Sequence, residues 1–341
     1  MLHWFHKHRR LLLIAAIIII LIGGGVVTLI VKQVQARYQS TIYTGSSTAK
    51  TTNTSKPISI LLLGVDTGAD GRITKGNSDT IMVVTINPKT KKTVITSIPR
   101  DLLAQMKGTK TTNVQKLNAA YNIGGSTMAK ASVSALLNIP INYYATINMG
   151  GLKQIVNAVG GVKIKSPMKV SYDGITITKG WHHLNGKQAL TYTRMRYQDP
   201  RGDYGRQLRQ QQVMKAVLTK IAKAQTWSRY SELLTALKGN LKTDLSFKDM
   251  VALATNDKAN VKNIKSTQLI GTEAWINTSS YQIASTKTLQ KTSNALRKQL
   301  GLKAEKLSNM ETKLNALNPS YNGTTNTTYN TDGLDSITYS E

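Results

Sequence analysis

The chain between Thr193 and Gln212 is rich in arginine. Its sequence, TRMRYQDPRGDYGRQLRQQQ, holds arginines at 194, 196, 201, 206 and 209 and no lysine. A guanidinium is a planar fork that donates paired hydrogen bonds, so an arginine-only patch indicates a phosphate or carboxylate partner. The stretch therefore predicts a site for an anion.

Helical spacing predicts which of these residues face inward. If the residues after Asp203 form a helix, Arg206, Gln210, Val213 and Val217 fall on one line. The valines must face a core, so Arg206 and Gln210 are expected to point inward as well. An unpaired buried charge is costly, so Arg206 needs an anionic partner. Either Asp203 or a bound phosphate would satisfy it.

Three acidic residues and an arginine stand at the ends of predicted strands. Asp66 closes ISILLLGVD, Asp79 precedes TIMVVTI, and Arg100 and Asp101 follow TVITSI. Catalytic groups often lie where strands end, because the sheet fixes them and the loops leave room for a ligand. Each residue alone could instead cap a turn or pair with a neighbour. Four of them at three strand ends favour a site.

Other site chemistries have less support. His182 and His183 are adjacent, and the chain has no cysteine, which disfavours a zinc site. No Gly-x-Ser-x-Gly elbow is present, so a serine triad has little support. The loop GVDTGADG lacks the glycine spacing of a Walker or dinucleotide loop.

The elements that would position these residues alternate between strands and helices. We expect strands at 58–66, 80–86 and 93–98, the last two joined as a hairpin, and short strands and turns over 162–186. We expect helices at 118–121, 126–137, 149–159, 205–224, 231–238, 246–256 and 285–300. This mixture predicts one α/β or α+β domain over residues 57–300.

The N-terminal residues predict the compartment. Residues 1–10 are basic, and residues 11–31 form an uncharged apolar run about as long as a bilayer is thick. This run is longer than the apolar region of a cleaved signal peptide, so we expect a retained transmembrane helix. The basic flank should stay in the cytoplasm, which places the rest of the chain outside the cell membrane.

Two further segments and the net charge complete this organisation. Residues 32–56 are expected to form an extracytoplasmic linker, and residues 301–341, Asn/Thr-rich from Asn315 onward, a disordered tail. The 341-residue chain has 45 Lys and Arg against 17 Asp and Glu, a net charge of +28. Such a charge indicates an anionic partner. The predicted topology disfavours nucleic acid as that partner.

Several long motifs, in order, resemble the LytR-CpsA-Psr family. They are LLLGVDTG, NSDTIMVVTINPKTKK, SIPRDL, INYYATINMGGLKQIVNAVGGV and LNGKQALTYTRMRYQDPRGDYGRQLRQQQV. The resemblance covers about residues 58–300. It implies a three-layer α-β-α sandwich around a central mixed sheet, with a long apolar pocket for a polyprenyl chain.

The resemblance also implies roles for individual residues. Asp79 and Asp101 match acidic positions associated with Mg²⁺ (or Mn²⁺) and the pyrophosphate, and Asp66 is the third. The positions that contact the pyrophosphate match Arg100, Arg194, Arg206 and Gln210, with Arg196 nearby. Many relatives carry arginine where this chain has Asn77, and Arg72 or Lys75 could supply that charge instead.

The activity implied is transfer of an anionic glycopolymer from undecaprenyl pyrophosphate to peptidoglycan. Teichoic acid, capsule and exopolysaccharide are all candidate polymers, and membrane lipid is a further partner. The hydroxyl of N-acetylmuramic acid would attack, Asp66 or Asp101 would take its proton, and Arg100 would neutralise charge. A pyrophosphatase using water as acceptor, or a non-catalytic envelope or transcriptional regulator, are the alternatives.

Overall fold

The computed structural model describes residues 56–67, 76–223, 237, 239–256 and 263–335, together with 32, 33, 35, 36, 39, 40, 43 and 44. The predicted basic flank and transmembrane helix lie outside these residues, as do loop 68–75 and nearly all of the predicted helix 231–238. Within the described residues, no helix is both long enough and apolar enough to cross a bilayer.

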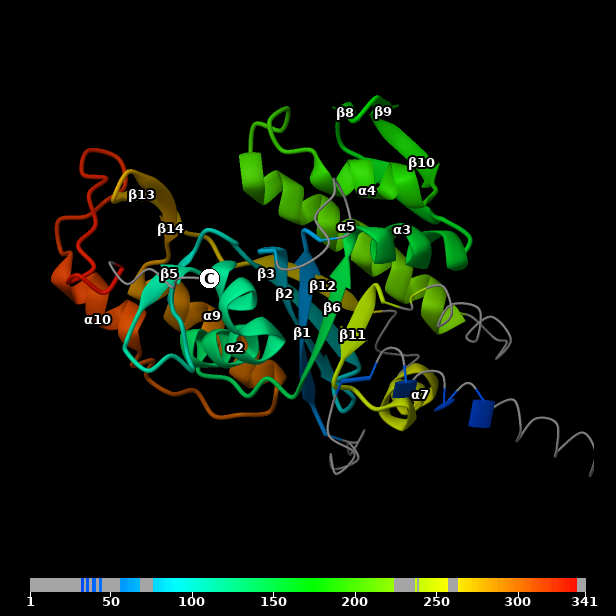
Figure 1. Cartoon of the computed structure of the whole chain (residues 1–341), viewed down its shortest axis with the longest axis horizontal. Helices are drawn as coiled ribbons and strands as arrows, with labels where there is room; N and C mark the ends of the chain where they lie inside the picture. Colours follow the sequence, from blue (N-terminus) through cyan, green and yellow to red (C-terminus); the bar gives the residue numbers. More distant parts are fainter. Residues whose placement is uncertain are drawn as a thin grey trace, which may run out of the picture.

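A six-stranded mixed sheet forms the centre of the molecule (Figure 1). Its order is β11 (Leu241–Thr243), β6 (Tyr143–Asn148), β1 (Ile58–Val65), β2 (Ser78–Asn87), β3 (Lys92–Ile98) and β12 (Ile264–Gln268). Strand β2 is antiparallel to β1 and β3, whereas β1–β6 and β3–β12 are parallel pairs. The predicted strands at 58–66, 80–86 and 93–98 are confirmed, with small changes at their ends.

Helices cover both faces of this sheet, which makes the fold a three-layer α/β sandwich. On one face α2 (Ala119–Leu137) and α9 (Thr286–Gln299) bury Leu61, Leu63, Val83 and Ile98. On the other face α5 (Gly202–Lys223) packs Met214 and Leu218 against the opposite side of the strands. Burial on both faces explains why β1 reads as a nearly continuous apolar run.

A second core lies on the outer side of α5. It belongs to a small lobe built from α3 (Met149–Ala158), β7 (Val162–Ser166), β8 (Val170–Tyr172), β9 (Ile175–Ile177), β10 (Gly180–Leu184) and α4 (Gly186–Arg194). Val213 and Val217 of α5 are buried in this second core. Helix α5 is therefore packed between the sheet and the small lobe, as Figure 1 shows.

The C-terminal residues are folded, and the prediction of a disordered tail over 301–341 was wrong for residues 301–335. Helix α10 (Met310–Leu317) begins with a capping box at Asn309. Its Leu314, with Tyr329 further along, is buried against the hairpin of β13 (Thr272–Ile276) and β14 (Ser279–Ile283) and the pair β4 (Leu103–Gln105) and β5 (Val114–Lys116). Packing against distant elements orders a segment whose own sequence shows no period.

Two local features agree with the sequence reading. The predicted gap between helices 118–121 and 126–137 coincides with non-helical Gly124 and Gly125 inside α2, where Gly125 has a φ of 64° that glycine tolerates. Helix α7 (Phe247–Asn256) has Ser246 as its N-cap, because the Ser246 hydroxyl accepts a hydrogen bond from the Asp249 amide at 3.1 Å.

Part of the predicted linker is attached to the sheet. Tyr43 forms a parallel bridge with Thr243 of the edge strand β11, and the amide of Thr44 donates to the Thr243 carbonyl at 2.8 Å. The Thr44 hydroxyl also lies 2.5 Å from the Tyr144 hydroxyl on β6. The chain therefore contacts the sheet edge before it enters β1.

Candidate active site

Three strand ends bring Arg100 and the predicted carboxylates to one edge of the central sheet. Asp66 follows the last residue of β1, Asp79 is the second residue of β2, and Arg100 and Asp101 follow β3. Because β2 is antiparallel to both neighbours, the end of β1, the start of β2 and the end of β3 share an edge. The juxtaposition expected from the sequence is present.

Arg100 is held between two of these carboxylates. Its Nη1 lies 2.6 Å from Oδ1 of Asp79, and its Nε lies 3.5 Å from Oδ2 of Asp101. The three side chains are 20%, 29% and 23% exposed, so solvent or a ligand can still reach them. This edge therefore presents a cation flanked by two acids.

Arg206 reaches the same edge from α5. Its side chain is 8% exposed, as the helical spacing predicted, and its Nη2 donates to the backbone oxygen of Asp79 at 3.3 Å. The same nitrogen lies 2.6 Å from Oδ1 of Asp203, so the chain does supply an internal anion for it. Arg100 and Arg206 thus approach Asp79 from two different elements.

The two guanidinium groups keep hydrogen-bonding capacity. Nε of Arg100 and Nε of Arg206 are both buried and make no hydrogen bond within the described residues. A buried donor without an acceptor costs about 1–3 kcal/mol, more when it is charged. An anion that accepted from these nitrogens would remove that cost, which fits the anion site that the sequence predicts.

The charges at this edge influence one another. Burial lowers the pKa of Arg206; the positive charges of Arg100 and Arg196 lower it further, and Asp203 and Asp79 oppose them. Burial also acts to lower the pKa of Arg100, but Asp79, with Asp101 and Asp203, outweighs it and raises that pKa. Arg100 and Arg206 are therefore two positive charges that repel each other, and a negatively charged ligand would reduce that repulsion.

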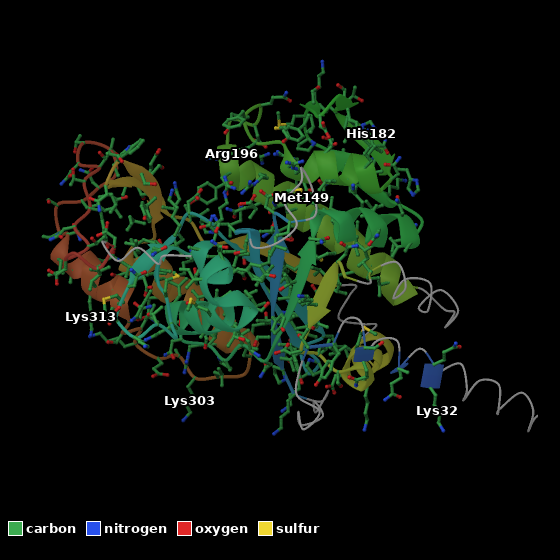
Figure 2. All side chains as sticks on the ribbon, viewed as in Figure 1. Lys32, Met149, His182, Arg196, Lys303 and Lys313 are labelled. Atoms are coloured by element: carbon green, nitrogen blue, oxygen red, sulfur yellow. The ribbon has the colours of Figure 1, made fainter. Side chains whose placement is uncertain are left out.

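Arg196 and Gln210 flank this pair. Arg196 lies on the loop before α5, labelled in Figure 2, and its guanidinium carbon is 5.6 Å from the ring centroid of Tyr197. Gln210, one helical turn after Arg206, is partly buried, and its Nε2 lies 3.5 Å from the carbonyl oxygen of Thr193. Both residues lie near Arg206, and within the described residues no hydrogen bond or ion pair joins either of them to Arg206.

Arg194 has different surroundings. It is the last residue of α4, and its guanidinium carbon is 5.3 Å from the ring centroid of Tyr172. It lines a hollow of about 290 Å³ together with Lys153 and Lys187 of the small lobe. The structure thus places Arg194 beside the small-lobe hollow, while its role at the pyrophosphate stays a prediction.

The region around Asp66 is described only in part. Asp66 is partly buried, and its amide donates to the Asn77 carbonyl at 3.2 Å, which holds the two strand ends together. Asn77, at the position where the resemblance predicts an arginine, is exposed. Arg72 and Lys75 lie outside the described residues.

Sequence reasoning missed a buried ion pair next to the site. Arg209 is 1% exposed; its Nη1 is paired with Oδ2 of Asp199, and its Nε donates to the Tyr192 carbonyl at 3.0 Å. Arg201 adds a second hydrogen bond to Asp199 at 2.9 Å. The spacing could have indicated Arg209, because it lies four residues before buried Val213 and so shares its helical face.

This pair fastens the loop that carries Arg196 to helix α5. Burial acts to raise the pKa of Asp199, but the hydrogen bonds from Arg201 and Arg209 outweigh it and lower the pKa to about 2. Gly205 leaves the space that Asp199 occupies, because a Cβ there would lie 2.1 Å from its Oδ2. The buried pair therefore has a structural role, distinct from that of Arg206.

The carboxylates suit a magnesium ion only with help from a ligand. Among the described residues, no group of three or more His, Cys, Asp and Glu side chains could hold a metal ion by itself. Asp79 and Asp101, on either side of Arg100, offer two carboxylates. Mg²⁺ is commonly bound by one or two carboxylates together with substrate phosphates, so these residues fit an ion that arrives with a phosphorylated ligand.

Comparison with known proteins identifies relatives over most of the chain. The model of the LytR_cpsA_psr family matches residues 26–298. A relative from Enterococcus faecalis, described as a polyisoprenyl-teichoic acid–peptidoglycan teichoic acid transferase TagU, is 44% identical over 251 residues, covering 74% of this chain and 82% of its own. The biofilm regulatory protein A of Streptococcus mutans is 42% identical over 79% of this chain and 70% of its own.

Solved structures of similar proteins have the same fold over most of the chain. B. subtilis TagV superposes with a TM-score of 0.65 at 31% identity, covering 73% of this chain and 99% of its own. A structure of TagT bound to LIIa-WTA has a TM-score of 0.63 at 27% identity, covering 76% and 100%. TagT, a protein with the matched fold, has thus been solved with LIIa-WTA bound.

Proposed function

The chain belongs to the LytR-CpsA-Psr family, and on that premise we propose that it transfers an anionic glycopolymer from a polyprenyl pyrophosphate carrier to peptidoglycan. The names of the relatives support a transferase acting on teichoic acid and peptidoglycan. We propose undecaprenyl as the carrier lipid and the hydroxyl of N-acetylmuramic acid as the acceptor.

One observation carries the proposal. Arg100 and Arg206 come from different elements and meet around Asp79, and each has a buried Nε that makes no hydrogen bond to the part of the chain that the structure describes. A pyrophosphate offers several oxygens at short spacing, which could accept from both guanidinium groups at once. Arg196 and Gln210 lie beside this position and would bind the outer oxygens.

The reaction exchanges one phosphorus–oxygen bond for another. The acceptor hydroxyl oxygen attacks the phosphorus that bears the glycan, and the bond to the carrier's phosphate breaks. The products are a glycan phosphodiester on peptidoglycan and polyprenyl monophosphate. Negative charge accumulates on the leaving phosphate. Arg100 and Arg206 would stabilise this charge, because their guanidinium groups are already in position before the reaction.

The proton of the attacking hydroxyl needs an acceptor. Asp101, beside Arg100, and Asp66, at the end of β1, both lie at this edge of the sheet. A carboxylate within hydrogen-bonding reach of the hydroxyl would take the proton as the new bond forms. We propose that one of these two aspartates is the base.

A divalent ion completes the proposed site. Asp79 and Asp101 would hold Mg²⁺, with Mn²⁺ as a substitute, together with the phosphate oxygens. When bound, the ion would neutralise part of the charge on the leaving phosphate.

The proposed location is the outer side of the cell membrane, with residues 11–31 as a single-pass anchor and residues 1–10 in the cytoplasm. The anchor would keep the site near carrier lipid in the same bilayer. Protease added outside intact cells should remove the domain, and a domain that is cut only after the cells are opened would contradict this topology.

A transfer assay tests the function. The full-length protein is mixed with Mg²⁺, a labelled polyprenyl-pyrophosphate glycan and peptidoglycan oligomers, beside Arg100→Ala and the matched control Arg201→Ala. Arg201 belongs to the same arginine-rich stretch but is 46% exposed at its side chain and pairs with Asp199. We expect label on peptidoglycan with the native protein and with Arg201→Ala, and a loss of about 100-fold or more with Arg100→Ala.

Other products would point to other functions. Label released as free glycan phosphate, whether or not peptidoglycan is present, would identify a pyrophosphatase. Tight carrier binding without turnover would indicate a non-catalytic regulator. Full activity after chelation of divalent ions would remove the metal from the proposal.

A further inference from the structure

Two hollows on the small lobe meet at one side chain, Asn157. The first encloses about 290 Å³ and is lined by Lys153, Lys187 and Arg194 among others. The second encloses about 410 Å³, and His183 is one of its lining residues. Asn157 lines both, so the two hollows adjoin at this residue.

The first hollow is positively charged. Lys187 and Arg194 are seven residues apart on α4, two helical turns, and so lie on one face of that helix. Lys153 contributes a third cation from α3, while Asp173 is the single acidic residue among the described residues that line the hollow. An anionic ligand would be attracted to this position.

Polar and aromatic side chains accompany these charges. Tyr172 is 37% exposed and carries the Arg194 guanidinium over its ring. Asn157 is exposed, and its Oδ1 accepts a hydrogen bond from the Gly186 amide at 2.7 Å, which fixes the orientation of the amide group. An aromatic ring, an oriented amide and several cations together suit a ligand with carbon faces, hydroxyls and phosphates.

The hollow lies next to the proposed pyrophosphate cluster along the chain. Arg194 is two residues before Arg196, and the charge of Arg196 acts on the buried Arg206. Figure 2 shows Arg196 and His182 both in the upper part of the molecule. A polymer attached to a pyrophosphate at Arg206 could therefore continue over the small lobe.

We propose that this hollow is a second subsite, which binds a glycan phosphate unit of the anionic polymer while the pyrophosphate lies at Arg100 and Arg206. Lys153 and Lys187 bind the phosphodiester, the ring of Tyr172 packs against a sugar or polyol, and Asn157 hydrogen-bonds to a hydroxyl. This assignment rests on the proposed function, since it presumes an anionic polymer as donor.

A binding experiment tests the subsite without the transfer reaction. The probe is a fluorescent glycerol phosphate oligomer that carries neither lipid nor pyrophosphate, titrated into the full-length protein. The double variant Lys153→Gln/Lys187→Gln should bind about tenfold more weakly, because two exposed charge-assisted contacts are removed. Tyr172→Ala should also weaken binding, because it removes the ring that packs against the sugar or polyol. Every charge stays in place in this variant, so its loss of affinity would not come from a change in charge.

The matched control is Lys303→Gln/Lys313→Gln. It removes the same net charge from exposed positions that lie far from His182 of the small lobe in Figure 2. We expect this control to bind like the native protein. An equal loss in both double variants would show that net charge alone binds the oligomer, and native affinity in Lys153→Gln/Lys187→Gln would overturn the subsite; circular dichroism verifies that each variant is folded.

A transfer measurement separates this inference from the proposed function. With a long polymer donor, Lys153→Gln/Lys187→Gln should raise KM severalfold and leave kcat nearly unchanged. With a donor truncated to its first disaccharide, the variant should match the native protein. If the native protein transfers neither donor, the proposed function fails, while the oligomer titration still decides whether the hollow binds a glycan phosphate.

Discussion

Arg206 and Arg209 are three residues apart on α5, and both are almost fully buried. Arg209 has its hydrogen bonds satisfied by Asp199 and by backbone carbonyls. Arg206 retains a buried Nε that has no hydrogen-bond acceptor among the described residues. The two side chains therefore have different roles: Arg209 holds the structure together, and Arg206 is available to a ligand.

Alanine substitutions should separate these roles. Arg209→Ala leaves Asp199 buried beside Arg201 alone, and we expect it to lower the free energy of unfolding by about 3–5 kcal/mol. Arg206→Ala should change that free energy by only about 1 kcal/mol but lower the transfer rate by about 100-fold or more. Denaturant unfolding and the transfer assay measure the two effects, and a folded, fully active Arg206→Ala would remove it from the site.

Asp199 should also produce a pH dependence of stability. Its pKa is lowered to about 2 in the folded protein, from an ordinary value of 3.8 for an aspartate. Its contribution is therefore complete above pH 4 and is lost as the pH falls toward 2, by about 2 kcal/mol. Unfolding measured between pH 5 and 2 should show this loss, and Asp199→Asn, which cannot ionise, should show a flatter curve.

At the scale of elements, Gly205 in the first turns of α5 provides a sharp test. Replacing a helical glycine by alanine usually stabilises a protein by up to about 1 kcal/mol. Here the added methyl would meet the buried carboxylate of Asp199 at 2.1 Å. We expect Gly205→Ala to lower the melting temperature and to reduce transfer, because the loop carrying Arg196 is displaced; a stabilised variant would show that this packing is not tight.

The C-terminal segment should be required for stability. Leu314 of α10 is 1% exposed, and Oε1 of Glu311 accepts a hydrogen bond from the Gln105 amide at 2.7 Å. We expect Leu314→Ala to lower the free energy of unfolding by about 2–5 kcal/mol, measured by denaturant titration. Leu317→Ala, at a position that is 53% exposed on the same helix, is the control and should have little effect.

The contrast between β1 and this tail shows what a sequence can predict. Leu61 and Leu63 belong to a nearly unbroken apolar run, so the strand could be recognised from its own residues. The order of the tail depends on contacts distant in sequence, such as the hydrogen bond that Nδ2 of the Asn309 side chain donates to the Leu136 carbonyl at 2.8 Å. No hydrophobic or helical pattern in the local sequence predicts such a contact.

The candidate site could be predicted to a similar extent. The positions of Asp79, Arg100 and Asp101 at strand ends and the inward direction of Arg206 followed from element ends and helical period. The surroundings of Arg194 did not, because they depend on how Tyr172 of β8 packs against α4. The neighbours of such a side chain are set by tertiary packing, which the local sequence does not show.

At the scale of the whole molecule, the net charge of +28 should accelerate capture of an anionic polymer. Raising the salt concentration from about 0.05 to 0.5 M should slow association with the polymer by about tenfold or more, because exposed charges are screened. The Arg100–Asp79 contact is partly buried and is screened less, so kcat with a truncated donor should change little. Stopped-flow binding and steady-state rates at several salt concentrations measure both, and a salt-independent association rate would contradict this role of the charge.

The attachment of Tyr43 and Thr44 to β11 has a mechanical consequence. A pull applied through the N-terminal segment meets the three-residue edge strand β11 before it reaches β1 in the middle of the sheet. The hydrogen bonds to Thr243 would therefore part before the load reaches β1. Tension on the N-terminal segment is thus taken up first at the margin of the fold, before it reaches the strands that hold Asp79 and Arg100.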